Sequence, residues 1–371
     1  MRKFDRASVD TAVTWIDGAT HRLGVEQVAL NQASGRVLAS DLYAAVPIPV
    51  VDCAAVDGFA VRAAETIGAS AYNPLVVAST AVAAKMPLPE ATDAVVPLDQ
   101  AEPADHGDVV LVEPVAAGAN VVRQGTVAAG GALLMPARTR LTPHHVGLLG
   151  LAGFSEAPAT RRPRVCLAIP SFLQSHAATD ADGPMIRAAV ERDRGVILEA
   201  PLAEAFTGLD ADIVLVIGGA EPGRDGGSAA ALAAAGTLDL HGVAVIPGES
   251  TGFGRTAARV PVVLLPDPPA DCWWSYELFA GRAIRRLGGR DSGLPYRTQT
   301  ATLMRKIASS IGVTEIRPIR LRSEREIEPI PGFVESGLIA AVEADGFVVV
   351  PEASEGYPQG MSITAYLYRE R

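Results

Sequence analysis

The sequence predicts a mixed α/β and β protein of several domains, and three observations support that prediction. The chain has 371 residues, more than one ordinary hydrophobic core organises. Residues 164–169 and 212–217 are continuous apolar runs, which are typical of strands in a parallel sheet that is covered on both faces. Short Val- and Leu-rich segments broken by Pro, Gly and Asp precede and follow these runs, as in all-β regions.

The N-terminal half begins with a helical pattern and continues with strands. Residues 9–16 have the apolar spacing of a short helix, and residues 25–45 have the mixed, Pro-bounded composition of a linker. The next apolar segments are short and bounded by turn residues, so we expect them to form a small β insertion. They are residues 74–79, 93–98, 109–114 and 131–135.

After Pro163 the pattern changes. Helical runs near residues 184–192 and 228–235 lie between the two apolar strands and beyond them, which predicts an α/β domain. Residues 291–371 return to short strands separated by Pro, Gly and acidic turns. A separate C-terminal β domain is therefore expected.

Composition excludes several classes of partner. The net charge of −10 disfavours phosphate backbones and anionic membranes, and no basic run with interleaved aromatic residues indicates nucleic-acid binding. No stretch approaches the 18 or so apolar residues of a membrane span, and the N-terminus shows no apolar signal region. The three cysteines, Cys53, Cys166 and Cys272, form no Cys-x-x-Cys pair, so neither a disulfide framework nor a structural zinc site is expected. A cytoplasmic location follows as an expectation.

Residues 47–60 set one carboxylate, Asp57, on a turn between two apolar segments. Gly58 can adopt a positive φ without steric cost, and Pro47 and Pro49 stiffen the approach, so the sequence predicts that Asp57 is held in a fixed place. A fixed carboxylate can coordinate or orient a ligand. The simpler interpretation is a surface hairpin whose Asp only stabilises its own turn.

Gly218 and Gly219 follow the apolar run 212–217, so they are expected at the carboxyl edge of the sheet, where α/β proteins bind ligands. Backbone N–H groups there suit a phosphate, although tight strand-to-helix packing explains two glycines equally well. His144 and His145 follow Thr142, which can cap a helix, and a metal role for them lacks visible ligands. Trp273 and Trp274 fall on a predicted helix and are most simply core or interface residues, with stacking on a pterin as the alternative.

Residues 47–60 also resemble the signature Pro-x-x-x-(Phe)-Asp-Asn-Ser-Ala-Met-Asp-Gly-Tyr-Ala of the MoeA family. These are the molybdopterin molybdenumtransferases that include the C-terminal domain of gephyrin. Further matches follow in family order along nearly the whole chain. They are Leu88-Pro89, 93–96, 122–125, 162–165, 211–212, Gly218-Gly219, Pro247-Gly248, Leu265-Pro266, Ser336-Gly337 and 344–346.

The resemblance implies a domain plan. It comprises an N-terminal helix (1–22) that joins the α/β domain, a linker domain (23–40 and 129–160), a β insertion (41–128), an α/β molybdopterin-binding-like domain (161–290) and a C-terminal β-barrel-like domain (291–371). It further implies an elongated homodimer whose active site lies where the insertion of one subunit meets the α/β domain of the other.

The resemblance also implies chemistry, namely insertion of molybdate into adenylylated molybdopterin with Mg²⁺. Asp57 and Asp225 match acidic positions that would act in catalysis and hold the metal ion. Cofactor binding is implied for Gly218, Gly219, Pro247, Gly248 and Ser336, with Arg255 as a candidate to supply positive charge.

Several site positions depart from the family pattern. Gly125-Thr126-Val127 stands where members carry Gly-Glu-Asp, so two carboxylates are replaced. Residues 245–250 match a segment with two lysines, but Glu249 replaces one of them and an apolar residue replaces the other. Because burying an unpaired anion costs several kcal/mol, these changes disfavour an anionic pterin phosphate.

Three functions are consistent with this pattern. The chain is a molybdenumtransferase with a remodelled site, or a catalytically inactive homologue, or an enzyme acting on another pterin or nucleotide in the same cleft. The inactive homologue would be a binding or scaffold subunit, or a chaperone, for a molybdoenzyme or another pterin- or nucleotide-related pathway. The expected partners are a second copy of the chain, a molybdopterin-like or nucleotide ligand, and a molybdoenzyme or pathway protein.

Overall fold

The computed structural model describes residues 6–169, 181–207, 210–218, 227–331 and 337–368. The chain divides into two compact units, residues 1–25 with 160–371, and residues 26–159. None of the helices in the described ranges is long and apolar enough to cross a bilayer.

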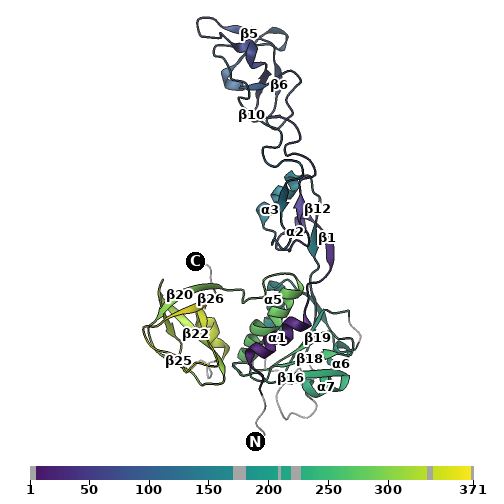
Figure 1. Cartoon of the computed structure of the whole chain (residues 1–371), viewed down its shortest axis with the longest axis vertical. Coiled ribbons are helices and arrows are strands. Elements are labelled where there is room, and N and C mark those ends of the chain that lie inside the picture. Colours follow the sequence, from purple (N-terminus) through teal and green to yellow (C-terminus); the bar gives the residue numbers. More distant parts are fainter. Residues whose placement is uncertain (1–5, 170–180, 208–209, 219–226, 332–336, 369–371) are drawn as a thin grey trace. The chain divides into compact units, whose positions relative to one another are not determined.

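A six-stranded sheet in the order β14-β13-β15-β19-β18-β16 forms the centre of the first unit (Figure 1). The first four strands are parallel and the last two pair antiparallel at one edge. Their bounds are β13 (Arg164–Ala168), β14 (Val196–Glu199), β15 (Ile213–Ile217), β16 (Gly236–His241), β18 (Gly252–Thr256) and β19 (Pro261–Leu265). The predicted α/β sheet is confirmed.

Helices cover both faces of this sheet, which explains the continuous apolar runs. Alternate residues of β13 contact different cores, Val165 and Leu167 one of them and Cys166 and Ala168 the other. The helices of the first core are α1 (Val9–Ala19), α5 (Asp182–Arg192), α8 (Pro269–Ser275), a π-helix (Tyr276–Ala280) and α9 (Gly281–Leu287), and those of the second are α6 (Leu202–Ala205) and α7 (Ser228–Ala235).

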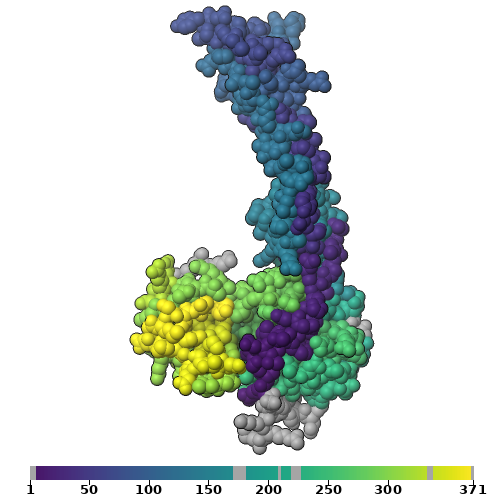
Figure 2. Space-filling view, viewed as in Figure 1, coloured from purple at the N-terminus to yellow at the C-terminus, as the bar shows by residue number. Residues whose placement is uncertain are grey.

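The C-terminal domain is a closed five-stranded β-barrel, a rounded lobe that is yellow-green to yellow in Figure 2. The ring runs β22-β23-β20-β26-β24 and closes because β24 also pairs with β22. The bounds are β20 (Arg297–Leu303), β22 (Thr314–Ser323), β23 (Glu326–Pro329), β24 (Gly346–Val350) and β26 (Ser362–Leu367).

Strand β17 (Val245–Ile246) pairs with the start of β22, and the ring of Trp274 on α8 packs edge-on against Phe347, 4.7 Å between centroids. Trp274 is therefore a core residue, as predicted.

The second unit contains the predicted small strands. Two three-stranded sheets, β6-β4-β7 and β5-β9-β8, form the insertion. Their strands are β4 (Gly58–Val61), β5 (Leu75–Val77), β6 (Thr80–Val82), β7 (Ala94–Pro97), β8 (Glu102–Pro103) and β9 (Val109–Leu111). The segment 131–135 was expected in this insertion, but β11 (Leu133–Met135) pairs with β2 (Leu42–Tyr43) in a separate two-stranded sheet.

The remainder of this unit has its own small core around Leu38, Leu141 and Leu149. Strand β1 (Val25–Ala29) pairs with β12 (Glu156–Thr160), beside the helices α2 (Leu30–Ala33) and α3 (Pro143–Leu151). Thr142 caps α3 as predicted, in a capping box: its hydroxyl accepts from the backbone N–H of His145, and its own N–H donates to Nδ1 of His145 (3.1 Å). The two histidines therefore have a structural role at this helix end.

Candidate functional site

Asp57 lies on an exposed turn between β3 (Cys53–Ala54) and β4. Its Oδ1 accepts a hydrogen bond from the N–H of Ala84 at 2.7 Å. This bond anchors the carboxylate to the backbone beyond β6, so the structure holds the side chain in place as the sequence predicted. The same bond also fits the simpler interpretation, in which Asp57 stabilises its own loop.

The explanation predicted for Gly58 is wrong. Gly58 lies in strand β4 and is not one of the residues with positive φ. A Cβ atom at this position would lie 2.1 Å from the carbonyl oxygen of Val96 on β7. Glycine is needed because the neighbouring strand approaches too closely for any side chain.

Asp52 is a second carboxylate within residues 47–60, and each of its two oxygens accepts a hydrogen bond. Its Oδ1 accepts from the N–H of Gln124 at 2.7 Å, and its Oδ2 accepts from Arg123 at 2.6 Å. The Gln124 N–H and, next, the Arg123 guanidinium hold the pKa of Asp52 below its usual value. Arg123 is thus already paired with a carboxylate.

Gly218 follows β15 at the carboxyl edge of the sheet, with φ of 84°. Its N–H donates to the carbonyl of Leu265 at 2.7 Å, and its own carbonyl accepts from Oγ of Ser228 at 2.7 Å. These bonds tie β15 to β19 and to the start of α7. The backbone groups of Gly218 are therefore occupied within the chain, and the neighbouring candidates Gly219 and Asp225 lie outside the described residues.

Gly248 is also held by the chain itself. It follows Pro247, which has a cis peptide bond, and adopts φ of 112°. Its N–H donates to Oδ1 of Asp271 at 2.8 Å, and an added Cβ would lie 2.7 Å from Oγ of Ser275. The segment thus packs against α8, with its N–H directed at a carboxylate. The remaining candidate, Ser336, lies outside the described residues.

The charges near this segment are paired. Glu249 forms an ion pair with Arg6 (2.8 Å), and Arg255 forms one with Asp239 (2.8 Å). The Arg255 guanidinium also lies over the ring of Trp15, 4.9 Å from its centroid. The prediction that Arg255 supplies positive charge to a ligand gains no support, because Asp239 and Trp15 already satisfy this cation.

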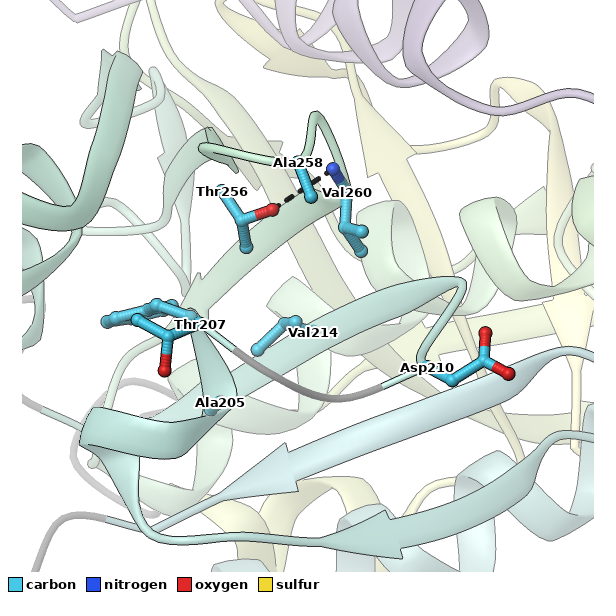
Figure 3. Close-up of a pocket in the computed structure, with 8 residues that line it drawn as sticks. Ala205, Thr207, Asp210, Val214, Thr256, Ala258 and Val260 are labelled. Atoms are coloured by element: carbon cyan, nitrogen blue, oxygen red, sulfur yellow. Dashed lines mark hydrogen bonds between the residues drawn. The ribbon is translucent and has the colours of Figure 1, made fainter.

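A pocket of about 330 Å³ lies elsewhere on the α/β sheet (Figure 3). Val214 is the second residue of β15 and Val260 directly precedes β19, so the pocket lies at the amino edge of the sheet, opposite to Gly218. None of the predicted site residues lines it, and no sequence signal indicated it. Its lining comprises Ala205, Phe206, Thr207, Asp210, Val214, Thr256, Ala258 and Val260.

The described residues alone do not fit a Mg²⁺ site. Within the ranges that the structure describes, no group of three His, Cys, Asp or Glu side chains could hold a metal ion. Asp57 offers one carboxylate, so a Mg²⁺ ion bound there would take its other ligands from substrate phosphates, water or a second carboxylate.

Sequence reasoning missed a buried cluster of charges between α5, the π-helix and α9. Glu277 accepts from Arg192 at 2.7 Å, and Asp193 accepts from Arg285 at 2.9 Å. Tyr276 donates to Asp193, and Tyr296, which precedes the barrel, lies 3.3 Å from Arg192. The only signal for the cluster was the occurrence of charged residues inside apolar helical patterns.

Together, the fold and the candidate positions define a multidomain α/β protein with a small β insertion and a terminal β-barrel. Family models of the MoeA N-terminal region (domain I and II) and of the MoeA C-terminal region (domain IV) match residues 7–153 and 300–368. The chain is 30% identical over 340 residues to molybdopterin molybdenumtransferase 2 of Mycobacterium tuberculosis, covering 78% of this chain and 82% of that protein. It belongs to the MoeA family of molybdenum cofactor biosynthesis proteins.

Two more distant similarities are consistent with this family. A molybdopterin molybdenumtransferase of Staphylococcus aureus is 24% identical over 386 residues, covering 92% of this chain and 90% of that protein. The crystal structure of a molybdopterin biosynthesis MoeA protein from Pyrococcus horikoshii superposes with a TM-score of 0.76 at 22% identity, covering 99% of this chain and 100% of that one. This last similarity supports the fold.

Proposed function

We propose that this chain is a catalytically inactive MoeA-family protein that serves molybdenum cofactor biosynthesis as a binding or scaffold subunit. The observation that carries the proposal is the pairing of charges around residues 247–255. The carboxylate of Glu249, which by the resemblance to the family pattern replaces a lysine, is paired with Arg6, and the cation of Arg255 is paired with Asp239. Insertion of molybdate requires a site that receives anions, and the one cation within residues 247–255, Arg255, is already paired.

The backbone supports the same proposal. Anion sites in α/β proteins use free N–H groups at the carboxyl edge of the sheet. The N–H groups of Gly218 and Gly248 instead donate to Leu265 and Asp271. Binding of a phosphate at these two positions would require those bonds to break.

The test is molybdenum cofactor formation from purified components. The full-length chain is mixed with adenylylated molybdopterin, molybdate and Mg²⁺, and activation of an apo-molybdoenzyme is measured, with the Staphylococcus aureus molybdopterin molybdenumtransferase as positive control. We expect activation at the level of the reaction without protein. Activation comparable to the control would disprove the proposal.

A second function is favoured by one observation, the anchored and exposed carboxylate of Asp57. If molybdate insertion is retained, Asp57 is the described residue best placed to hold Mg²⁺, and the carboxylate of Asp225 would complete that role. Turnover that depends on Asp57 would then identify the chain as a molybdenumtransferase with a remodelled site.

We further propose a homodimer in which the insertion of one subunit faces the α/β domain of the other. The order and spacing of the family motifs along the chain support this arrangement. Sedimentation velocity at micromolar concentration measures whether the chain is a dimer, and a monomer would contradict the proposal.

A further inference from the structure

The outer face of the sheet β5-β9-β8 in the insertion is apolar. The register places Val76 opposite Val110, which in turn lies opposite Glu102. Side chains alternate along these strands, so Val77 and Val109 enter the core while Val76 and Val110 point to the other side. The solvent face of such an antiparallel sheet is usually polar.

This apolar face is open to solvent. Val76 is 64% exposed, and Val112, which follows the last residue of β9, is 46% exposed. Tyr72, shortly before β5, is fully exposed. A contiguous patch of exposed apolar side chains is typical of an interaction surface, whereas single exposed apolar residues are common on any protein.

The segment that contains this sheet carries a strongly negative charge. Residues 62–113 contain two basic residues, Arg62 and Lys85, against eight carboxylates, so this segment accounts for more than half of the net charge of −10. Glu102 lies on the apolar face itself, and Asp108 directly precedes β9. The carboxylates are Glu65, Glu90, Asp93, Asp99, Glu102, Asp105, Asp108 and Glu113.

We propose that this face, formed by Val76, Val110, Val112 and Glu102, docks a partner protein that presents Lys or Arg side chains around an apolar side chain. Charge complementarity selects this occupant. A second copy of the chain placing the same face here would bring like charges together, which costs free energy, and nucleic acids or anionic membranes are repelled for the same reason. This surface shares no residue with the paired charges at 247–255 that carry the proposed function.

The test uses a random dodecapeptide library displayed on phage and selected on the immobilised full-length chain. We expect enriched peptides that combine at least one apolar side chain with several Lys or Arg residues. Synthetic versions should bind about tenfold or more weakly to the double variants Val76→Thr/Val112→Thr and Glu102→Lys/Asp108→Lys. The first double variant keeps β-branched residues in place of the valines, and the second replaces acidic with basic residues. If one of them fails to fold, peptide binding to the other still tests the proposal.

The control is Ile311→Thr, an equally exposed apolar residue (67%) in the other unit, which should leave peptide binding unchanged. Affinity for the wild type should also fall as salt rises from about 50 to about 500 mM, because screening weakens exposed charge pairs. The proposal is overturned by enriched peptides without basic residues, by double variants that bind the peptides as tightly as the wild type does, or by salt-independent binding. It is also overturned if Val76→Thr/Val112→Thr converts a dimer to a monomer in sedimentation, since the face would then join two copies.

Discussion

Arg192 and Glu277 form an ion pair, 2.7 Å between Nη1 and Oε1, in which the carboxylate is completely buried. The pair joins the end of α5 to the π-helix, and the Arg192 guanidinium also binds Asp193. Among the described residues, the second carboxylate oxygen of Glu277 has no hydrogen-bond partner. Burial therefore raises the pKa of Glu277, and Arg192 opposes that effect. The arginine is what allows this carboxylate to lie in the core.

The first prediction follows from that pair. Arg192→Met should lower the free energy of unfolding by about 3 to 5 kcal/mol, because it leaves Glu277 buried without its partner. The matched control is Arg187→Met on the same helix, whose partner Glu199 is largely exposed, so the loss there should be about 1 kcal/mol or less. Urea unfolding of both variants measures the difference. Equal losses of unfolding free energy in the two variants would show that the buried pair contributes no more to stability than the exposed pair.

The second prediction concerns pH. Asp17 on α1 accepts two hydrogen bonds from Arg282 on α9, at 2.8 and 2.6 Å, and these bonds lower the pKa of Asp17. A lowered pKa in the folded state gives stability that is present above the ordinary value near 3.8 and is lost as pH falls through the folded-state pKa. Asp17→Asn should therefore cost about 1 to 2 kcal/mol at neutral pH.

The same variant provides its own control through the pH series. The difference in stability between wild type and Asp17→Asn should shrink as the pH falls below about 4, because protonated aspartate resembles asparagine. Thermal unfolding of the wild type and of Asp17→Asn, from neutral pH to below about pH 4, measures this difference in stability. A difference that stays constant with pH would refute the assignment of the stabilisation to the charged pair.

The third prediction tests the close approach at Gly58. Gly58→Ala should destabilise the insertion by about 2 kcal/mol or more, because the new Cβ collides with the Val96 carbonyl and separates β4 from β7. Gly147→Ala on α3 of the same unit has open space around its Cβ and should be neutral or stabilising by up to about 1 kcal/mol. Calorimetric scans compare the two. A well-tolerated Gly58→Ala would mean that β4 and β7 separate without cost.

The fourth prediction concerns the ligand. Adenylylated molybdopterin should bind this chain about 10² to 10⁴ times more weakly than it binds a relative with both lysines and both acidic residues, since two lost charge-assisted hydrogen bonds account for that range. Calorimetry at physiological salt measures both affinities, with a relative whose sequence contains these four residues for comparison. Equal affinity would contradict the proposed loss of the anion site.

The fifth prediction separates the two candidate functions. If the wild type forms molybdenum cofactor, Asp57→Asn should abolish the activity without unfolding the protein, because Asn keeps the acceptor for the Ala84 N–H and loses only the charge. If the wild type is inactive, Asp57→Asn changes nothing in that assay. Turnover that persists in Asp57→Asn would contradict both candidates and place the active site elsewhere.

The sequence by itself determined the elements whose signal is local. The apolar runs that became β13 and β15 were predictable because a strand covered on both faces contains no polar alternation. The cap at Thr142 was predictable because its partner is three residues away. The order of the family motifs, likewise readable along the chain, predicted the α/β domain and the barrel.

Only the tertiary structure decided which charges are available to a ligand. Arg255 looked like a free cation, but β16 brings Asp239 to it and α1 brings Trp15. The sequence did not link Glu277 to its partner Arg192, which lies 85 residues away. Gly58 was expected to serve a turn, and the reason for it is a carbonyl on β7. Spacing along a chain specifies which face a residue occupies, whereas electrostatic pairing and close backbone contact depend on neighbours that only folding brings together.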